Sequence, residues 1–191
     1  MARSATSVAT RGTDWLTAGL GLLRDGGELS LTIDRLCQAL HRTKGAFYHH
    51  FGDLGAYQDR LLEHWEALNT AAPIAAAERA PRPDQRRSEL TRAVARLDLR
   101  VEQAVRAWAL RDARARRALV RVDQRRVQYL ASLSSKRPSR RALLLARLDY
   151  ATYLGAQQLL PSLSARDAKE LEQALRSDRK SDGARGGSAH G

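Results

Sequence analysis

Apolar residues recur every three or four positions along most of this 191-residue chain, which is the spacing of helices that bury one face. Short polar residues divide the pattern into segments, because a side-chain oxygen at the start of a helix accepts a hydrogen bond from a free backbone N–H. Asp14, Thr32, Asp53 and Asp112 each stand just before an apolar stripe. Residues that favour strands are sparse and never alternate over a strand's length. The pattern therefore predicts an all-α protein.

The first 70 residues contain several short helices in close succession. Gly26 and Gly27 end the first helix, and the third is very short, with Phe47 and Phe51 one turn apart. Three short helices within about 40 residues are typical of a helix-turn-helix unit. The expected elements are a polar, mobile arm at 1–12 and helices at about 14–26, 32–40, 43–51 and 53–68.

The remaining chain resumes the helical pattern after a break. Three prolines predict an irregular connection over Ala71–Pro83, and Asp98 is a candidate start for a further helix within the stripe that follows. The stripes predict helices at about 90–108, 112–133, 139–160 and 164–176, and the last residues, rich in Gly, Ser and charge, predict disorder.

The net charge of +12 favours a polyanionic partner, but its distribution does not mark the N-terminal part as the binding region. Residues 1–70 carry seven Lys or Arg against eight Asp or Glu, a net of −1, whereas residues 71–191 carry 26 against 13, a net of +13. A distributed excess of this kind is typical of solvated surface.

Cysteine usage and hydropathy indicate the compartment. Cys37 is the single cysteine, so no internal disulfide is possible. No apolar run approaches the roughly 20 residues needed to cross a bilayer, and the N-terminal segment lacks the apolar centre of a signal peptide. These features predict a cytoplasmic protein without membrane contact.

The third helix has the residue types that a DNA-recognition helix needs. If Phe47 and Phe51 face inward, its outer face is free to enter a major groove, which admits one helix. Its N-terminal end then places small or polar residues near base edges, and its exposed face directs donors at phosphates. The base-edge candidates are Thr43, Lys44, Gly45 and Ala46, and the phosphate candidates are Tyr48, His49 and His50.

The stretch LTIDRLCQALHRTKGAFYHHFGD, followed by an amphipathic helix, resembles the N-terminal domain of the tetracycline-repressor-like (TetR) family of regulators. The Gly-x-x-Tyr-x-x-Phe pattern of Gly45, Tyr48 and Phe51 is its most distinctive part, and the resemblance covers about residues 13–68. The later stretch VEQAVRAWALRD resembles the family's ligand-binding domain more loosely. The resemblance implies an all-α homodimer that represses transcription until a small molecule binds its C-terminal domain.

Two residues depart from the family's pattern. His41 stands where the family usually has Gly in the turn, and Leu54 stands where it usually has a phosphate-contacting Lys. Gly55 follows and weakens the start of the fourth helix. These departures predict a DNA affinity that is lower than usual, or contacts that are placed differently.

The resemblance and the helical pattern together define three sets of residues. Trp108 is most simply a core residue, but in a sensor domain it also lines a ligand cavity. The helix at 139–160 has two apolar faces, and dimerisation would bury the second of them. The predicted DNA-binding set is Thr32, Arg42, Thr43, Lys44, Gly45, Ala46, Tyr48, His49 and His50. The predicted ligand cavity is bounded by Leu97, Val101, Val105, Trp108, Leu119 and Leu144. The predicted dimer interface contains Leu143, Tyr150, Tyr153, Leu154, Gln157, Leu171 and Leu175.

The sequence is therefore interpreted as a ligand-responsive, DNA-binding transcriptional regulator, not an enzyme, that binds palindromic double-stranded DNA as a homodimer and uses no cofactor. The predicted organisation is a helix-turn-helix domain at 1–52, a helical ligand-binding and dimerisation domain at 53–180, and a disordered tail at 181–191. The effector, the operator and the sign of regulation do not follow from the sequence.

Other chemistries fit this sequence less well. Cys37 and His41 have a spacing that suits zinc, but a closely spaced ligand set is missing, so no metal site is predicted. The same pair lacks the oxyanion donor and the orienting group of a nucleophilic site. A dimeric helical sensor or adaptor of the same fold, with weak or lost operator binding, is the main alternative, and a small helical hydrolase or isomerase is a third.

Overall fold

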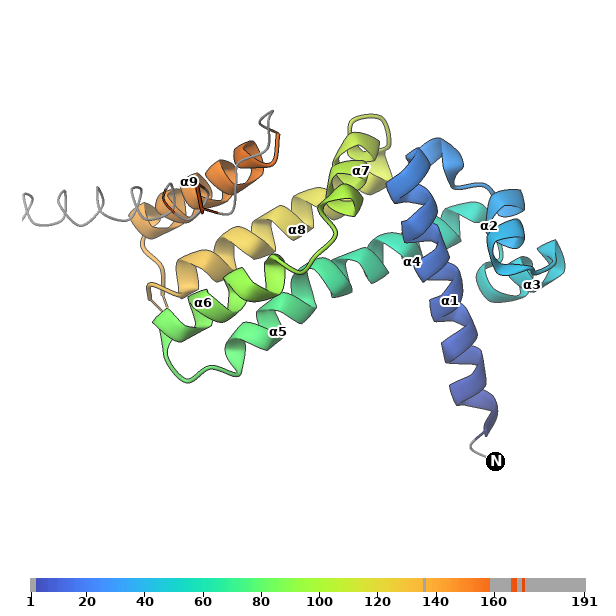
Figure 1. Cartoon of the computed structure of the whole chain (residues 1–191), viewed down its shortest axis with the longest axis horizontal. Coiled ribbons are helices and arrows are strands. Elements are labelled where there is room, and N and C mark those ends of the chain that lie inside the picture. The colour runs from blue at the N-terminus through green and yellow to red at the C-terminus, as the bar shows by residue number, and fades with distance from the viewer. Residues whose placement is uncertain (1–2, 136, 159–165, 168–169, 171–191) are drawn as a thin grey trace, which may run out of the picture. The chain divides into compact units, whose positions relative to one another are not determined.

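The computed structural model describes residues 3–135, 137–158, 166, 167 and 170, and every secondary-structure element in that part of the chain is helical, which confirms the predicted class. The chain divides into two compact units, Met1–Leu143 and Leu144–Gly191. None of the described helices is long and apolar enough to cross a membrane. The elements (Figure 1) are α1 (Arg3–Gly26), the 3₁₀ helix η1 (Glu28–Ser30), α2 (Ile33–Leu40), α3 (Lys44–Phe51), α4 (Leu54–Glu66), the π-helical segment η2 (Ala67–Ala71), α5 (Ala72–Glu78), α6 (Pro83–Val94), α7 (Leu99–Ala109), α8 (Ala113–Ser132) and α9 (Arg140–Ala156).

Capping side chains set the starts of most helices. Oxygens of Thr32, Thr43 and Asp53 accept hydrogen bonds from the backbone N–H three residues ahead, at 2.8 to 3.3 Å. Asp98 and Asp112 cap α7 and α8 in a similar way. A cap of this kind stabilises a helix by about 1 kcal/mol, and all five starts agree with those expected from the sequence.

Several expected boundaries are wrong. The stripe expected at about 90–108 is divided between α6 and α7, and α6 already begins at Pro83. α1 begins at Arg3, so the segment expected to be a mobile arm is helical and Asp14 lies inside a helix instead of capping one. α5 occupies much of the expected break, with Pro73 near its start. The expected tail at 181–191 and most of the helix expected at 164–176 lie outside the described residues.

One hydrophobic core joins the three N-terminal helices to α4, α7 and α8. Trp15 of α1 packs its ring edge against Phe47 and Phe51 of α3, with ring centroids 5.6 and 6.4 Å apart. Tyr57 of α4 is fully buried and donates a hydrogen bond to the Trp15 carbonyl oxygen at 2.9 Å. Buried side chains of α7 and α8 belong to the same core. α7 and α8 therefore pack together with α1 and α4, the helices that hold α3.

The helical path from α4 to α5 passes through η2, and α6 then folds back along α5 (Figure 1). A π-helical segment shifts the register of backbone hydrogen bonds, and it often marks a functional position in a helix. Asn69 and Thr70 of η2 are both buried, and Asn69 Nδ2 donates to the Trp65 carbonyl oxygen at 3.2 Å. The polar groups of this segment therefore need partners inside the protein.

Candidate nucleic-acid interface

The turn between α2 and α3 determines how α3 is presented. His41 ends α2 in the left-handed conformation, with φ 53° and ψ 46°, and its N–H donates to the Gln38 carbonyl at 3.3 Å. Thr43, in extended conformation, then caps α3. The turn thus adopts a conformation that favours glycine, although histidine occupies the position.

α3 separates its buried anchors from an exposed side. Phe47 and Phe51 are buried, whereas Tyr48 is 50% exposed and rests its ring edge on Phe47, with centroids 5.7 Å apart. All nine residues of the predicted DNA-binding set lie on the cap of α2, in the turn or on α3. Besides Tyr48, Thr32, Arg42, Thr43, Lys44, Gly45 and His49 are exposed, and Ala46 and His50 are half-buried.

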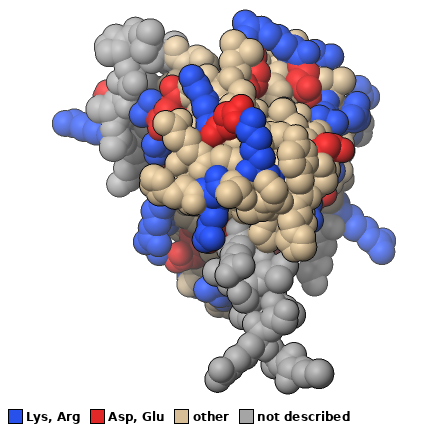
Figure 2. Space-filling view, turned by 90° about the vertical axis from the view of Figure 1, so that its right-hand side faces the viewer, with Lys and Arg blue, Asp and Glu red and all other residues tan. Residues whose placement is uncertain are grey.

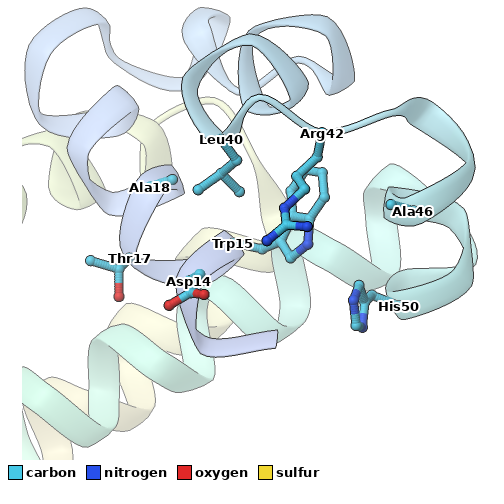
Figure 3. Close-up of a pocket in the computed structure, with 8 residues that line it drawn as sticks. All are labelled: Asp14, Trp15, Thr17, Ala18, Leu40, Arg42, Ala46 and His50. Atoms are coloured by element: carbon cyan, nitrogen blue, oxygen red, sulfur yellow. The ribbon is translucent and has the colours of Figure 1, made fainter. Parts of the chain in front are cut away.

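A groove with a volume of about 540 Å³ runs between α1 and the helix-turn-helix unit (Figure 3). In the figure, the Arg42 side chain extends toward Trp15, so its guanidinium and the His50 ring bring nitrogen atoms to the groove. The α1 wall is formed by Asp14, Trp15, Thr17 and Ala18, and the other wall by Leu40, Arg42, Ala46 and His50. Sequence reasoning missed the α1 wall because it gave Asp14 only a capping role.

The two cations nearest the start of α3 differ in their partners. Lys44 Nζ lies 2.7 Å from Asp34 Oδ1, and this hydrogen-bonded partner raises the pKa of Lys44. Arg42 makes no ion pair with any residue that the structure describes. Figure 2 shows acidic side chains among the basic ones on the face turned toward the viewer. A full, uncompensated charge therefore comes from Arg42 and not from Lys44.

Leu54 occupies the position in the first turn of α4 at which the resemblance implies a phosphate-contacting lysine, but Arg114 of α8 lies beside this turn. A Cβ on Gly55 would come within 3.1 Å of Arg114 Nη2, so the absence of a side chain there leaves room for this guanidinium. Arg114 Nε pairs with Asp59 at 2.7 Å, and Nη1 donates to Gln58 at 2.9 Å. The Arg114 side chain of α8 thus contacts the first two turns of α4 through Gln58 and Asp59.

Five of the six predicted cavity residues lie in the first unit. Val101, Val105 and Trp108 are buried in the shared core, Leu119 packs against that core, and Leu97 is half-buried. Leu144 belongs to the second unit and is 52% exposed. The ligand cavity stays a prediction.

The predicted dimer residues that the structure describes lie on α9 or next to it. Tyr150 is buried, and its ring stacks on the more exposed Tyr153 with centroids 6.4 Å apart. Leu143, Leu154 and Gln157 are half-buried, and Leu171 and Leu175 lie outside the described residues. The interface therefore also stays a prediction.

A buried charged network was missed by sequence reasoning. Glu102 of α7 is 5% exposed, and its carboxylate accepts from Arg126 Nη1 at 2.8 Å, from Arg126 Nη2 at 3.0 Å and from Arg106 Nε at 3.0 Å. Arg126 also donates to Thr70 Oγ1 at 2.9 Å and to the Asn69 carbonyl at 3.2 Å. One side chain of α8 thus ties α7 to η2, and only the i,i+4 spacing of Glu102 and Arg106 gave any signal in the sequence.

Metal-ligating side chains do not gather in the described part of the chain. No group of three or more His, Cys, Asp or Glu that could hold an ion occurs among those residues. Cys37 is a half-buried free thiol, and burial raises its pKa. Burial of this kind disfavours the thiolate that binds zinc.

Comparisons with known proteins give matches to solved structures. No family model matches the sequence, and no curated protein matches it. A structure described as a TetR/AcrR-family transcriptional regulator shares 19% identity with a TM-score of 0.71, over 90% of this chain and 98% of that one. A protein described as a TetR-family transcriptional regulator from Rhodococcus sp. shares 17% identity with a TM-score of 0.66, over 90% of this chain and 97% of that one. A transcriptional regulator from Pseudomonas aeruginosa PAO1 shares 14% identity with a TM-score of 0.71, over 91% of each chain.

Likeness at such low identity establishes a fold and leaves the activity to be argued from residues. The matched length includes the helix-turn-helix unit as well as the helices that follow it. The chain therefore has the fold of the TetR/AcrR transcriptional regulators.

Proposed function

We propose that this chain is a ligand-responsive transcriptional regulator of the TetR type that binds operator DNA through α3. The observation that carries the proposal is the pairing of α2 with α3 across the left-handed turn at His41. Phe47 and Phe51 hold α3 against α1, and the side that carries Tyr48 stays exposed. An exposed helix held in this way fits the major groove.

Phosphate donors near α3 support the proposal. Thr32 and Thr43 each accept a backbone hydrogen bond through the side-chain oxygen, which leaves the hydroxyl hydrogen for a phosphate oxygen. Arg42 offers a full charge, and Tyr48 offers a neutral hydroxyl. Contacts of this kind fix the register of a protein on DNA without reading its sequence.

Regulation would act through the core that α3 shares with the later helices. α7 and α8 contribute buried side chains to the core that also holds α1, α3 and α4. A ligand that repacks α7 or α8 would therefore change how α3 is held. Such a ligand shifts the protein off DNA only to the extent that it binds the free and DNA-bound states with different affinity.

A helical sensor or adaptor that lacks operator binding is the second candidate. Lys44 is paired with Asp34, and residues 1–70 carry a net charge of −1. Few counterions would then be released on binding, so the non-specific part of the affinity for DNA would be small. Operator binding would have to rest on specific contacts, and its absence would leave the adaptor function.

Selection of an operator from random double-stranded DNA tests the proposal, followed by affinity measurements across salt concentrations. Arg42→Ala is expected to lower the affinity and to reduce the log–log salt slope by about one unit per half-site, because one phosphate contact is lost. Tyr48→Phe is expected to weaken binding with little change of slope, because a neutral donor releases no counterion.

Arg92→Ala is the control, since Arg92 is an exposed arginine of α6 that pairs with Glu89. Its operator affinity and salt slope are expected to equal those of the parent. A parent that selects no sequence would reject the regulator in favour of the adaptor, whereas equal operator binding by the parent and all three variants would reject α3 as the contact with DNA.

A further inference from the structure

Asp34 and Lys44 form an ion pair between the two helices of the helix-turn-helix unit. Lys44 Nζ lies 2.7 Å from Asp34 Oδ1, and the two side chains are 60% and 75% exposed. Asp34 lies in the first turn of α2, and Lys44 opens α3 one turn before Tyr48. The pair therefore stands at the end of α3 that the proposed function directs toward base edges.

The pair presents a fixed order of hydrogen-bonding groups. Lys44 Nζ has three donors, of which Asp34 engages one, and Asp34 keeps a second carboxylate oxygen as an acceptor. In the major groove a G·C pair shows the acceptors guanine N7 and O6 beside the donor cytosine N4. O6 and N4 are hydrogen-bonded to each other at about 2.9 Å, close to the 2.7 Å that separates Nζ from Oδ1. The ammonium can face N7 and O6 while the carboxylate faces N4.

Other base pairs fit this order less well. An A·T pair in the same orientation keeps an N7 acceptor for the ammonium, but it turns the adenine N6 donor toward the ammonium and the thymine O4 acceptor toward the carboxylate, and these two contacts are repulsive. A C·G pair reverses both contacts in the same way. A T·A pair keeps an acceptor and a donor in the right order but lacks an N7 acceptor beside the ammonium. The expected order of preference is G·C, then T·A, then A·T and C·G.

We propose that Asp34 and Lys44 act together as a specificity-determining pair that reads one G·C base pair in each half-site, an inference that rests on the proposed function. An exposed ion pair contributes little stability to the free protein, because water screens it. A neutral pair also releases few counterions, so it adds discrimination and little salt-dependent affinity. Against a base pair, where water is excluded, the same charges interact more strongly.

The test uses the full-length protein and its selected operator, with each base pair of one half-site replaced in turn. For the parent, one position is expected at which G·C binds about tenfold or more tightly than A·T or C·G, with T·A between them. Asp34→Ala and Lys44→Ala are each expected to reduce this preference at that position, because each variant keeps only one of the two contacts, and to leave the preferences at other positions unchanged.

Asp25→Asn and Asp34→Asn form a matched pair of variants that remove the same charge. Asp25 is an exposed, ion-paired carboxylate near the end of α1, 2.8 Å from Arg24 Nε and outside the helix-turn-helix contact. Only Asp34→Asn is expected to weaken the preference, and thermal melting followed by circular dichroism checks that all variants fold. A preference for G·C that stays undiminished in both alanine variants would overturn this inference while the proposed function stands. A parent that selects no sequence would overturn the proposed function itself.

Discussion

His41 shows what one backbone conformation costs at the scale of a residue. Among the residues that the structure describes, it is the one non-glycine residue with a positive φ. A Cβ in this region costs about 1–2 kcal/mol, and glycine avoids that cost but loses more conformational freedom on folding. The turn of the helix-turn-helix unit therefore holds some strain in order to present α3.

Replacing His41 by glycine is expected to raise the free energy of unfolding by about 0.5–1 kcal/mol, which is the relief of strain less the added entropy cost. Urea unfolding followed by circular dichroism measures the change. His41→Ala keeps a Cβ at the same φ, so it is the control and is expected to be no more stable than the parent. A glycine variant that is less stable than the alanine variant would mean that the position is unstrained.

At the scale of elements, the network around Arg126 links helices that are far apart in sequence. The Arg126 guanidinium donates hydrogen bonds to the Glu102 carboxylate. It also donates to two polar groups of η2, Thr70 Oγ1 and the Asn69 carbonyl oxygen. In the part of the chain that the structure describes, removing Arg126 would leave Arg106 as the one cation beside the buried Glu102 carboxylate and would take a donor from η2, and breaking a buried ion pair costs up to about 3–5 kcal/mol. Arg126→Met is expected to lower the free energy of unfolding by about that amount.

The neighbouring Arg125 provides the matched control, because it is exposed and pairs with Glu66 at 3.2 Å. Glu66 keeps a second partner, Arg121, at 2.9 Å, so Arg125→Met is expected to cost less than about 1 kcal/mol. Denaturant unfolding measures both variants, and hydrogen exchange at Ala67–Ala71 reports on η2 directly. Equal losses in the two variants, with unchanged exchange in η2, would refute the link between Arg126 and the π-helical segment.

Features that depend on neighbouring residues could be predicted from the sequence, and those that depend on distant ones could not. Thr32, Thr43 and Asp98 cap helices as expected, because a cap is a local contact. The register shift at η2 and the network around Arg126 depend on residues brought together only by folding. The same reason hid the pairing of Asp34 with Lys44, which lie on different helices.

The whole molecule combines a locally specified recognition unit with a core that continues beyond it. The apolar stripes predicted which faces of α1, α3 and α4 are buried, and Phe47, Phe51 and Tyr57 are indeed in the core. The stripes did not show that Val105 and Trp108 of α7 would pack into that same core, because periodicity gives a face and not its partner. This continuity is what supports a coupling between the later helices and α3.

Recognition of two operator half-sites requires that two copies of the chain form a dimer. Leu144, which is in the predicted ligand-cavity set, and Leu148 lie one turn apart on α9 and are 52% and 51% exposed. They form an apolar strip, outside the predicted dimer set, that a second copy can cover. We expect light scattering at micromolar concentration to give twice the 21.2 kDa mass of the chain. Introducing Leu144→Glu and Leu148→Glu together is expected to give a folded monomer, because dimerisation would bury two unpaired carboxylates.

That monomer is expected to bind the selected operator at least about tenfold more weakly, because the two half-sites no longer act as one linked site. Leu29→Glu is the control, since Leu29 lies on η1 and is 83% exposed, and this change is expected to leave both mass and affinity unaltered. A double variant that stays dimeric would exclude this strip of α9 as the contact. A parent that is monomeric would remove the physical basis for a palindromic operator, because one recognition helix reads only one half-site.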